Sequence, residues 1–185
     1  MNLPNKITIA RILLTFIFMF FLFSRGLVFK MLALVTFLVA SASDFLDGYL
    51  ARKHNLITDF GRLMDPVADK VLVLAAFLAI VELKLVPAWM VVLIISRELI
   101  ITGVRIMAST KGSVLAASLA GKHKTVSQMA AIFAILCYLI LKEIGVRIPE
   151  YWMILLMFIT VVLTMASGVF YLIRNKNIFL NAKRN

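Results

Sequence analysis

Residues 43–70 read S-D-F-L-D-G-Y-L-A-R-K-H-N-L-I-T-D-F-G-R-L-M-D-P-V-A-D-K. Four aspartates in this stretch are spaced as D-x-x-D-G-x-x-A-R-x8-G-x-x-x-D-x-x-x-D and stand beside two apolar segments. A charged side chain near the centre of a membrane helix costs roughly 2.5 to 3.5 kcal/mol on insertion scales, so a group of four needs a compensating cation. The stretch therefore predicts two helices that meet at a divalent-metal site. Its ligands are expected to be Asp44, Asp47, Asp65 and Asp69.

The composition of the chain indicates a membrane protein. Hydrophobic residues make up 63% of the 185 residues and charged residues only 16%, which is not the balance of a soluble globular domain. At about 20 residues per helix, this length allows six membrane spans joined by short connections. We expect an all-α integral membrane protein whose single domain, residues 1–185, is a bundle of six transmembrane helices. The spans are predicted near residues 7–23, 31–51, 66–83, 86–106, 125–142 and 151–173.

The basic residues predict the orientation of the bundle. Lysine and arginine are retained on the cytoplasmic side of membrane proteins. If both termini are cytoplasmic, most of the 20 lysines and arginines fall on that face, together with the aspartates. We therefore expect a multi-pass protein of the cell inner membrane with its active site towards the cytoplasm. The net charge of +11 fits this rule and attraction to anionic lipid headgroups, and nothing further supports a nucleic-acid partner.

The spacing of the aspartates places each pair on one face of its helix. At 100° per residue, Asp44 and Asp47 project about 60° apart, and Asp65 and Asp69 about 40° apart. Oxygen ligands of this kind suit Mg²⁺ or Mn²⁺. Four carboxylates can hold one or two such ions and leave coordination positions for substrate phosphates, and two ions are expected here. This is the arrangement of a two-metal phosphoryl-transfer site.

Structural roles for the same aspartates remain open individually. Asp65 followed by Pro66 is a good helix start, with aspartate as the N-cap and proline at the first helical position. Asp69 has Lys70 beside it as a possible ion-pair partner, and Asp44 has Arg52. The joint spacing of the four aspartates favours the metal site.

Small residues accompany the aspartates. Gly48 and Ala51 lie three apart on the side of Asp44 and Asp47, and Gly61 lies four residues before Asp65. Side chains this small leave a flat groove in which a ligand can approach the helix closely. Arg52 can pair with a carboxylate or hold a phosphate through two hydrogen bonds.

The stretch matches the signature of the CDP-alcohol phosphatidyltransferases at every fixed position, and the chain resembles that family over essentially its whole length. The resemblance implies that phosphatidyl is transferred from CDP-diacylglycerol to an alcohol and that CMP is released. It implies metal ligation by the four aspartates, with Asp69 also acting as general base on the acceptor hydroxyl. It also implies a homodimer, for which Ala166, Ser167 and Gly168 would permit close helix contact.

A second polar cluster predicts the acceptor site. The fourth span contains R-E-L-I-I-T-G-V-R, and G-K-H-K-T follows it. A set of cations opening to the cytoplasm suits a phosphorylated, dianionic acceptor. The alternative is that Arg97 is neutralised by Glu98 or another carboxylate and that the lysines are ordinary juxtamembrane cations. The two motifs resemble the branch of the family whose acceptor is sn-glycerol 3-phosphate, and the resemblance implies that acceptor phosphate is held by Arg97, Thr102, Arg105, Lys122 and Lys124.

The N-terminal segment adds a third group. Asn5, Thr8 and Arg11 are spaced three apart, and related enzymes carry a similar N-x-x-T-x-x-R. Contact with the cytidine or pyrophosphate of the donor is one reading. The other is a helix start in which Asn5 is the cap and Arg11 snorkels to the membrane surface. The expected donor-binding set is Asn5, Thr8, Arg11, Asp47, Gly48, Ala51, Arg52 and Gly61.

Two other functional classes compete with an enzyme. Acids and bases inside a membrane often mark the ion path of a transporter or channel. Against this reading, the acidic pairs occupy cytoplasmic helix ends and no inverted repeat is present. A non-catalytic scaffold would not need the spaced aspartates. The sequence therefore favours an enzyme.

Overall fold

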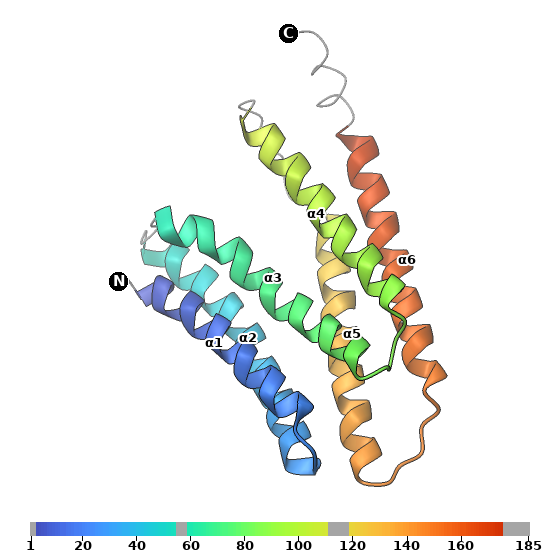
Figure 1. The fold of residues 1–185 in the computed structure, drawn as a ribbon. Coiled ribbons are helices and arrows are strands. Elements are labelled where there is room, and N and C mark those ends of the chain that lie inside the picture. The colour runs from blue at the N-terminus through green and yellow to red at the C-terminus, as the bar shows by residue number, and fades with distance from the viewer. Residues whose placement is uncertain (1–2, 55–58, 111–118, 176–185) are drawn as a thin grey trace. The chain divides into compact units, whose positions relative to one another are not determined.

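The structure is a computed structural model. It describes the backbone of residues 3–54, 59–110 and 119–175 and the side chains of residues 9–43, 70–108 and 124–175. Over these residues the fold is helical, with no strand (Figure 1). The six predicted helices are confirmed, each within a few residues except at the starts of the third and the fifth. They are α1 (Leu3–Phe23), α2 (Leu27–His54), α3 (Asp59–Glu82), α4 (Ala88–Thr110), α5 (Leu119–Glu143) and α6 (Tyr151–Arg174).

The start of α3 corrects one sequence interpretation. The helix begins at Asp59, so Asp65 and Pro66 lie inside it. The reading of Asp65 as an N-cap with proline at the first helical position is therefore wrong. Proline removes a single i→i−4 hydrogen bond from a helix interior, here the one to the carbonyl of Arg62. The helical turns on both sides of Pro66 continue in spite of that loss.

The chain divides into two compact units, and the first is residues 1–83 with 132–149. Within it, α1 packs against α2 and α3, and α2 also contacts α3. The rings of Phe18 and Phe37 meet between α1 and α2 with their centroids 5.8 Å apart. Ala33 and Ala40 are fully buried on α2. Small side chains at these buried positions allow helices to pack closely.

A buried lysine closes the carboxyl end of α1. Lys30 is only 8% exposed, and its Nζ donates to the carbonyl oxygens of Leu22 at 2.6 Å and Ser24 at 2.9 Å. The last carbonyls of a helix have no partner within the helix and carry partial negative charge, so a cation there is favourable. Gly26 makes the turn to α2 with a φ of +103°, which a glycine adopts without steric cost. Lys30 thus fixes the α1–α2 hairpin.

We expect Lys30→Met to destabilise the protein without touching the proposed chemistry. The substitution leaves one buried and one partly buried carbonyl without their donor, which costs about 1–3 kcal/mol. The melting midpoint of the purified protein in detergent should fall by several degrees. Lys84→Met is the control, since Lys84 is exposed between α3 and α4. If the two variants had equal melting midpoints, Lys30 would not have the proposed capping role.

The second unit is residues 84–131 with 150–185, and in it α4 packs along α6. Ile101 and Val104 of α4 form a buried cluster with Tyr171 of α6, and Leu172 packs against it. Because these apolar residues fix α4 to α6, the polar side chains on the same faces are held close to one another. The candidate acceptor site lies there.

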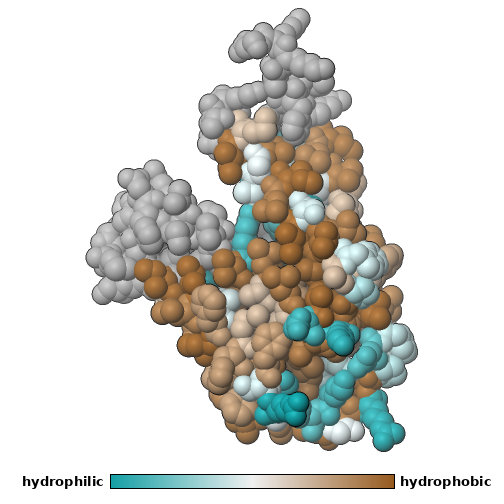
Figure 2. Space-filling view, in the orientation of Figure 1, coloured by the Kyte–Doolittle hydropathy of each residue, from teal (hydrophilic) through white to brown (hydrophobic). Residues whose placement is uncertain are grey.

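Large apolar side chains are exposed on the surface of the helices. Phe16 is 67% exposed, Val126 67% and Phe170 70%, and Figure 2 shows hydrophobic residues over much of the visible face. In the described part of the chain, two helices are long and apolar enough to cross a membrane, Lys124–Glu143 of α5 and Tyr151–Arg174. Ile9–Phe23 and Leu27–Ser43 are shorter apolar helices. Six spans therefore remain a prediction.

Candidate active site

The four motif aspartates lie on two consecutive helices of the first unit. Asp44 and Asp47 are in the second half of α2, and Asp65 and Asp69 are in the first half of α3. The helical backbone confirms the basis of the sequence argument, since residues three or four apart on a helix share a face. Their side chains lie outside the described residues, as do those of Gly48, Ala51, Arg52 and Gly61.

The donor set of this motif fits a hard divalent cation. Four carboxylates supply only oxygen ligands, which Mg²⁺ and Mn²⁺ prefer. The two helices that carry them are in contact with each other. Among the side chains that the structure describes, no three or more His, Cys, Asp or Glu residues are grouped as a metal site. Sequence and backbone thus place the candidate metal ligands on α2 and α3.

The structure contradicts the reading of the N-terminal residues as a capped helix start with a snorkelling arginine. Asn5 lies inside α1, which begins at Leu3, so the reading of Asn5 as the helix cap is wrong. Arg11 is only 1% exposed and does not snorkel to a surface. The side chains of Asn5 and Thr8 lie outside the described residues. Contact of Arg11 with the donor stays a prediction.

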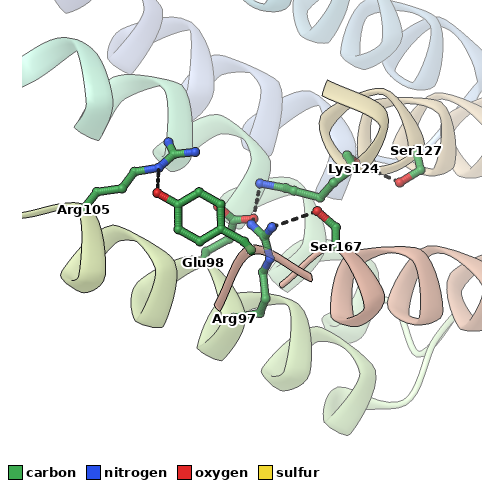
Figure 3. Close-up of polar contacts among 7 residues, drawn as sticks. Arg97, Glu98, Arg105, Lys124, Ser127 and Ser167 are labelled. Atoms are coloured by element: carbon green, nitrogen blue, oxygen red, sulfur yellow. Dashed lines mark hydrogen bonds and ion pairs between the residues drawn. The ribbon is translucent and has the colours of Figure 1, made fainter. Parts of the chain in front are cut away.

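The polar cluster on α4 is present and extends to α5 and α6. Arg97 is 8% exposed, and its Nη1 lies 3.3 Å from the Oε1 of Glu98. Glu98 also forms an ion pair with Lys124 of α5 (Figure 3). The Nη2 of Arg97 donates to the Oγ of Ser167 at 3.1 Å. The alternative pairing of Arg97 with Glu98 is therefore observed, but the same carboxylate is shared with a second cation.

Arg105 lies two turns after Arg97 on α4 and contacts α6. Its Nε donates to the hydroxyl oxygen of Tyr171 at 3.3 Å, and its Cζ lies 5.3 Å from the centre of the Tyr171 ring. Arg105 is exposed, whereas Tyr171 is only 4% exposed. No other described residue accepts a hydrogen bond from Arg105. Its two terminal nitrogens therefore remain available to a ligand.

The charges of this cluster suit a dianion. Among the side chains that the structure describes, three cations, Arg97, Arg105 and Lys124, are grouped with the one carboxylate of Glu98, an excess of two positive charges. A phosphate monoester carries up to two negative charges at neutral pH. Thr102 is half-buried on the same helix, and the side chain of Lys122 lies outside the described residues. The structure brings Arg97 and Lys124 together at Glu98, and the acceptor role of the set stays a prediction.

Sequence reasoning missed the residues of α6 that contact these arginines. Ser167 and Gly168 were interpreted only as small residues for helix contact between subunits, and Tyr171 was not considered. In the structure Ser167 and Gly168 are buried beside Arg97 of the same chain. The signal in the sequence was the spacing of 167, 168 and 171, which puts a hydroxyl, a glycine and a phenol on one helix face.

Comparison with known proteins identifies the family. The sequence model of the CDP-alcohol phosphatidyltransferases matches residues 1–173. The chain belongs to the CDP-alcohol phosphatidyltransferase family. It is 42% identical to a CDP-diacylglycerol–glycerol-3-phosphate 3-phosphatidyltransferase of Bacillus subtilis, over 94% of this chain and 95% of that protein. Proteins of the same name match from Haemophilus influenzae, at 38% identity over 92% and 91%, and Rickettsia bellii, at 40% over 71% and 72%.

Membership of the CDP-alcohol phosphatidyltransferase family confirms the resemblance carried by residues 43–70. The match runs through the helices of both units, from α1 to the end of α6. The aspartate motif on α2 and α3 and the cationic cluster of α4, α5 and α6 therefore both belong to the matched region. The first is suited to metal and pyrophosphate, and the second to an anionic acceptor.

Proposed function

We propose that this protein transfers the phosphatidyl group of CDP-diacylglycerol to sn-glycerol 3-phosphate, giving phosphatidylglycerol phosphate and CMP in phospholipid biosynthesis. The family supports the donor and the reaction type, and the names of relatives matched over more than nine-tenths of the chain support the acceptor. The observation that carries the acceptor is the cluster of Arg97, Arg105 and Lys124 with its excess of two positive charges. A transporter or scaffold would need neither the donor chemistry of this family nor this cationic cluster.

The proposed setting is the inner membrane, crossed by six helices with both termini in the cytoplasm. The exposed apolar side chains and the two helices of sufficient length support a membrane location. The distribution of lysine and arginine supports the orientation. We further propose one membrane domain over residues 1–185 and a homodimer, the latter from the family alone. Because Ser167 and Gly168 are buried against Arg97, a dimer contact would use other residues.

On the donor side, the proposed roles follow from the charge of the pyrophosphate. Asp44, Asp47, Asp65 and Asp69 would hold one or two Mg²⁺ or Mn²⁺ ions, which would neutralise pyrophosphate oxygens and the departing CMP. Gly48, Ala51 and Gly61 leave space beside the helices for the donor, and Arg52 and the buried Arg11 can hold its phosphates. Asn5 and Thr8 share the helix of Arg11 and complete the proposed donor set.

On the acceptor side, Arg97, Arg105, Lys122 and Lys124, with Thr102, would hold the phosphate of glycerol 3-phosphate and so fix the position of its hydroxyl. That hydroxyl attacks the phosphorus bearing the diacylglycerol, and its proton passes to the carboxylate of Asp69. The bond from that phosphorus to the CMP oxygen breaks. Because a carboxylate near cations has low proton affinity, Asp69 accepts the proton late, once attack has acidified the hydroxyl.

An acceptor panel tests the proposed function. Purified protein in detergent receives CDP-diacylglycerol, Mg²⁺ and one of four labelled acceptors: glycerol 3-phosphate, serine, inositol phosphate or phosphatidylglycerol. We expect product label from glycerol 3-phosphate alone. If label were transferred only to another acceptor, the family reaction would stand but glycerol 3-phosphate would be the wrong acceptor. If label were transferred to none of the four acceptors, the proposed phosphatidyltransferase activity would be contradicted.

Removal of divalent cations tests the metal site. We expect excess EDTA to abolish transfer and Mg²⁺ or Mn²⁺ to restore it, because the four aspartates would otherwise repel one another and the pyrophosphate. A readout independent of activity is the melting midpoint, which should rise with Mg²⁺ in the wild type and by clearly less in Asp65→Asn, which has one fewer carboxylate ligand. Full activity in excess EDTA, or the same shift of the melting midpoint in both proteins, would contradict a metal site formed by these aspartates.

A further inference from the structure

Two arginines of α4 contact one face of α6. Arg97 contacts Ser167 and Gly168, and Arg105 contacts Tyr171. The three residues of α6 fall within little more than one helical turn, and we refer to Ser167, Gly168 and Tyr171 as the α6 brace. None of them carries a charge that would bind an acceptor directly. Their contacts with the arginines instead determine where the guanidinium groups lie.

Gly168 provides the path for the side chain of Arg97. A Cβ atom at this position would lie 2.9 Å from the Cγ of Arg97 and 3.1 Å from its Nε. Real Cβ atoms do not approach other atoms so closely, so an alanine would displace the arginine. Beside it, the Oγ of Ser167 accepts from Nη2 in a buried hydrogen bond, with Ser167 only 7% exposed. Glycine and serine together therefore fix one orientation of Arg97.

Tyr171 provides a rigid support for Arg105. Its ring is buried among Ile101, Val104 and Leu172, while its hydroxyl accepts from the Nε of Arg105. The guanidinium also lies within cation–π distance of the ring. A side chain held through Nε and its plane has lost much of its rotational freedom before any ligand arrives. Both terminal nitrogens have no hydrogen-bond partner among the described residues and can form a bidentate hydrogen bond to an oxyanion.

We propose that the α6 brace consists of positioning residues that hold Arg97 and Arg105 ready for the phosphate of the acceptor. The inference rests on the proposed function, because it assigns these arginines to glycerol 3-phosphate. Arginine has a flexible stem, and ordering it in advance removes that entropic cost from binding. Loss of the brace should weaken the acceptor complex and leave the donor complex unchanged.

Kinetic constants of brace variants test this assignment. Tyr171→Phe removes the hydroxyl and keeps the ring, and we expect it to raise the KM for glycerol 3-phosphate about three- to tenfold, the effect of one hydrogen bond. The KM for CDP-diacylglycerol should not change. Gly168→Ala should act in the same direction through Arg97. The matched control is Thr160→Val, which removes a buried hydroxyl of α6 that, among the described residues, bonds only to the Leu156 carbonyl.

A double-mutant cycle separates positioning from general stability. If Tyr171 acts through Arg105, Tyr171→Phe should have no further effect on the acceptor KM in an Arg105→Ala background. An effect of the same size in both backgrounds would overturn the proposal, as would an equal rise of both KM values in Tyr171→Phe. Failure of the brace proposal can be distinguished from failure of the proposed function. Absence of transfer to glycerol 3-phosphate by the wild type would contradict the proposed function itself.

Discussion

Asp69→Asn is expected to lower turnover by roughly 10²- to 10⁴-fold, the contribution of a positioned general base, while CDP-diacylglycerol binding is largely kept. Asparagine has nearly the size of aspartate but cannot take the proton of the acceptor hydroxyl. Three carboxylates of the motif would remain to hold the cation that binds the pyrophosphate. The measurements are kcat, from labelled glycerol 3-phosphate entering lipid, and donor affinity, from equilibrium binding of labelled CDP-diacylglycerol.

Asp59→Asn is the matched control for this substitution. Asp59 is the first residue of α3, on the same helix as Asp69 but outside the fixed positions of the motif. We expect its turnover to match the wild type. Substantial residual turnover in Asp69→Asn would exclude the base role. Loss of turnover accompanied by equal loss of donor binding would indicate that Asp69 serves mainly as a metal ligand.

Arg105→Ala is expected to raise the KM for glycerol 3-phosphate about 10- to 100-fold, since hydrogen bonds to charged groups are each worth about 1.5–3 kcal/mol. The terminal nitrogens of Arg105 have no hydrogen-bond partner among the described residues, and Tyr171 holds the guanidinium from the other side. The KM for CDP-diacylglycerol should change little, because the proposed donor ligands lie on α1, α2 and α3. Initial rates with each substrate varied in turn measure both constants.

Arg174→Ala controls for the loss of one positive charge. Arg174 is exposed in the last turn of α6. We expect both of its KM values to match the wild type. If Arg105→Ala raised the two KM values equally, Arg105 would have a structural role in fixing α4 to α6. The much smaller effect expected for Tyr171→Phe follows from the same geometry, because that variant keeps the guanidinium.

The helices were predictable because apolar runs bounded by charges, proline or glycine are a local signal. All six helices follow those runs, and the largest difference is the start of α3. There Asp65 and Pro66 form the local pattern of a helix start, yet the chain is already helical from Asp59. A local pattern shows that a residue type suits a helix start, but it does not show where the preceding residues begin the helix.

The candidate site was predictable where it depends on spacing along one helix. The pairing of Asp44 with Asp47, or of Arg97 with Arg105, needs only the helical period. The contacts of Arg97 with Ser167 and of Arg105 with Tyr171 join residues 70 and 66 positions apart. No periodicity relates such residues, since their proximity depends on how α4 packs against α6. The brace therefore emerged only from the structure.

The central claim is that glycerol 3-phosphate accepts the phosphatidyl group of CDP-diacylglycerol at this protein. The most direct measurement follows CMP release and the entry of labelled glycerol 3-phosphate into lipid in the same reaction of the purified wild type. We predict equal molar amounts of the two products, with neither formed when glycerol 3-phosphate is omitted. CMP release without label in the lipid, or no release with all substrates and Mg²⁺ present, would contradict the claim.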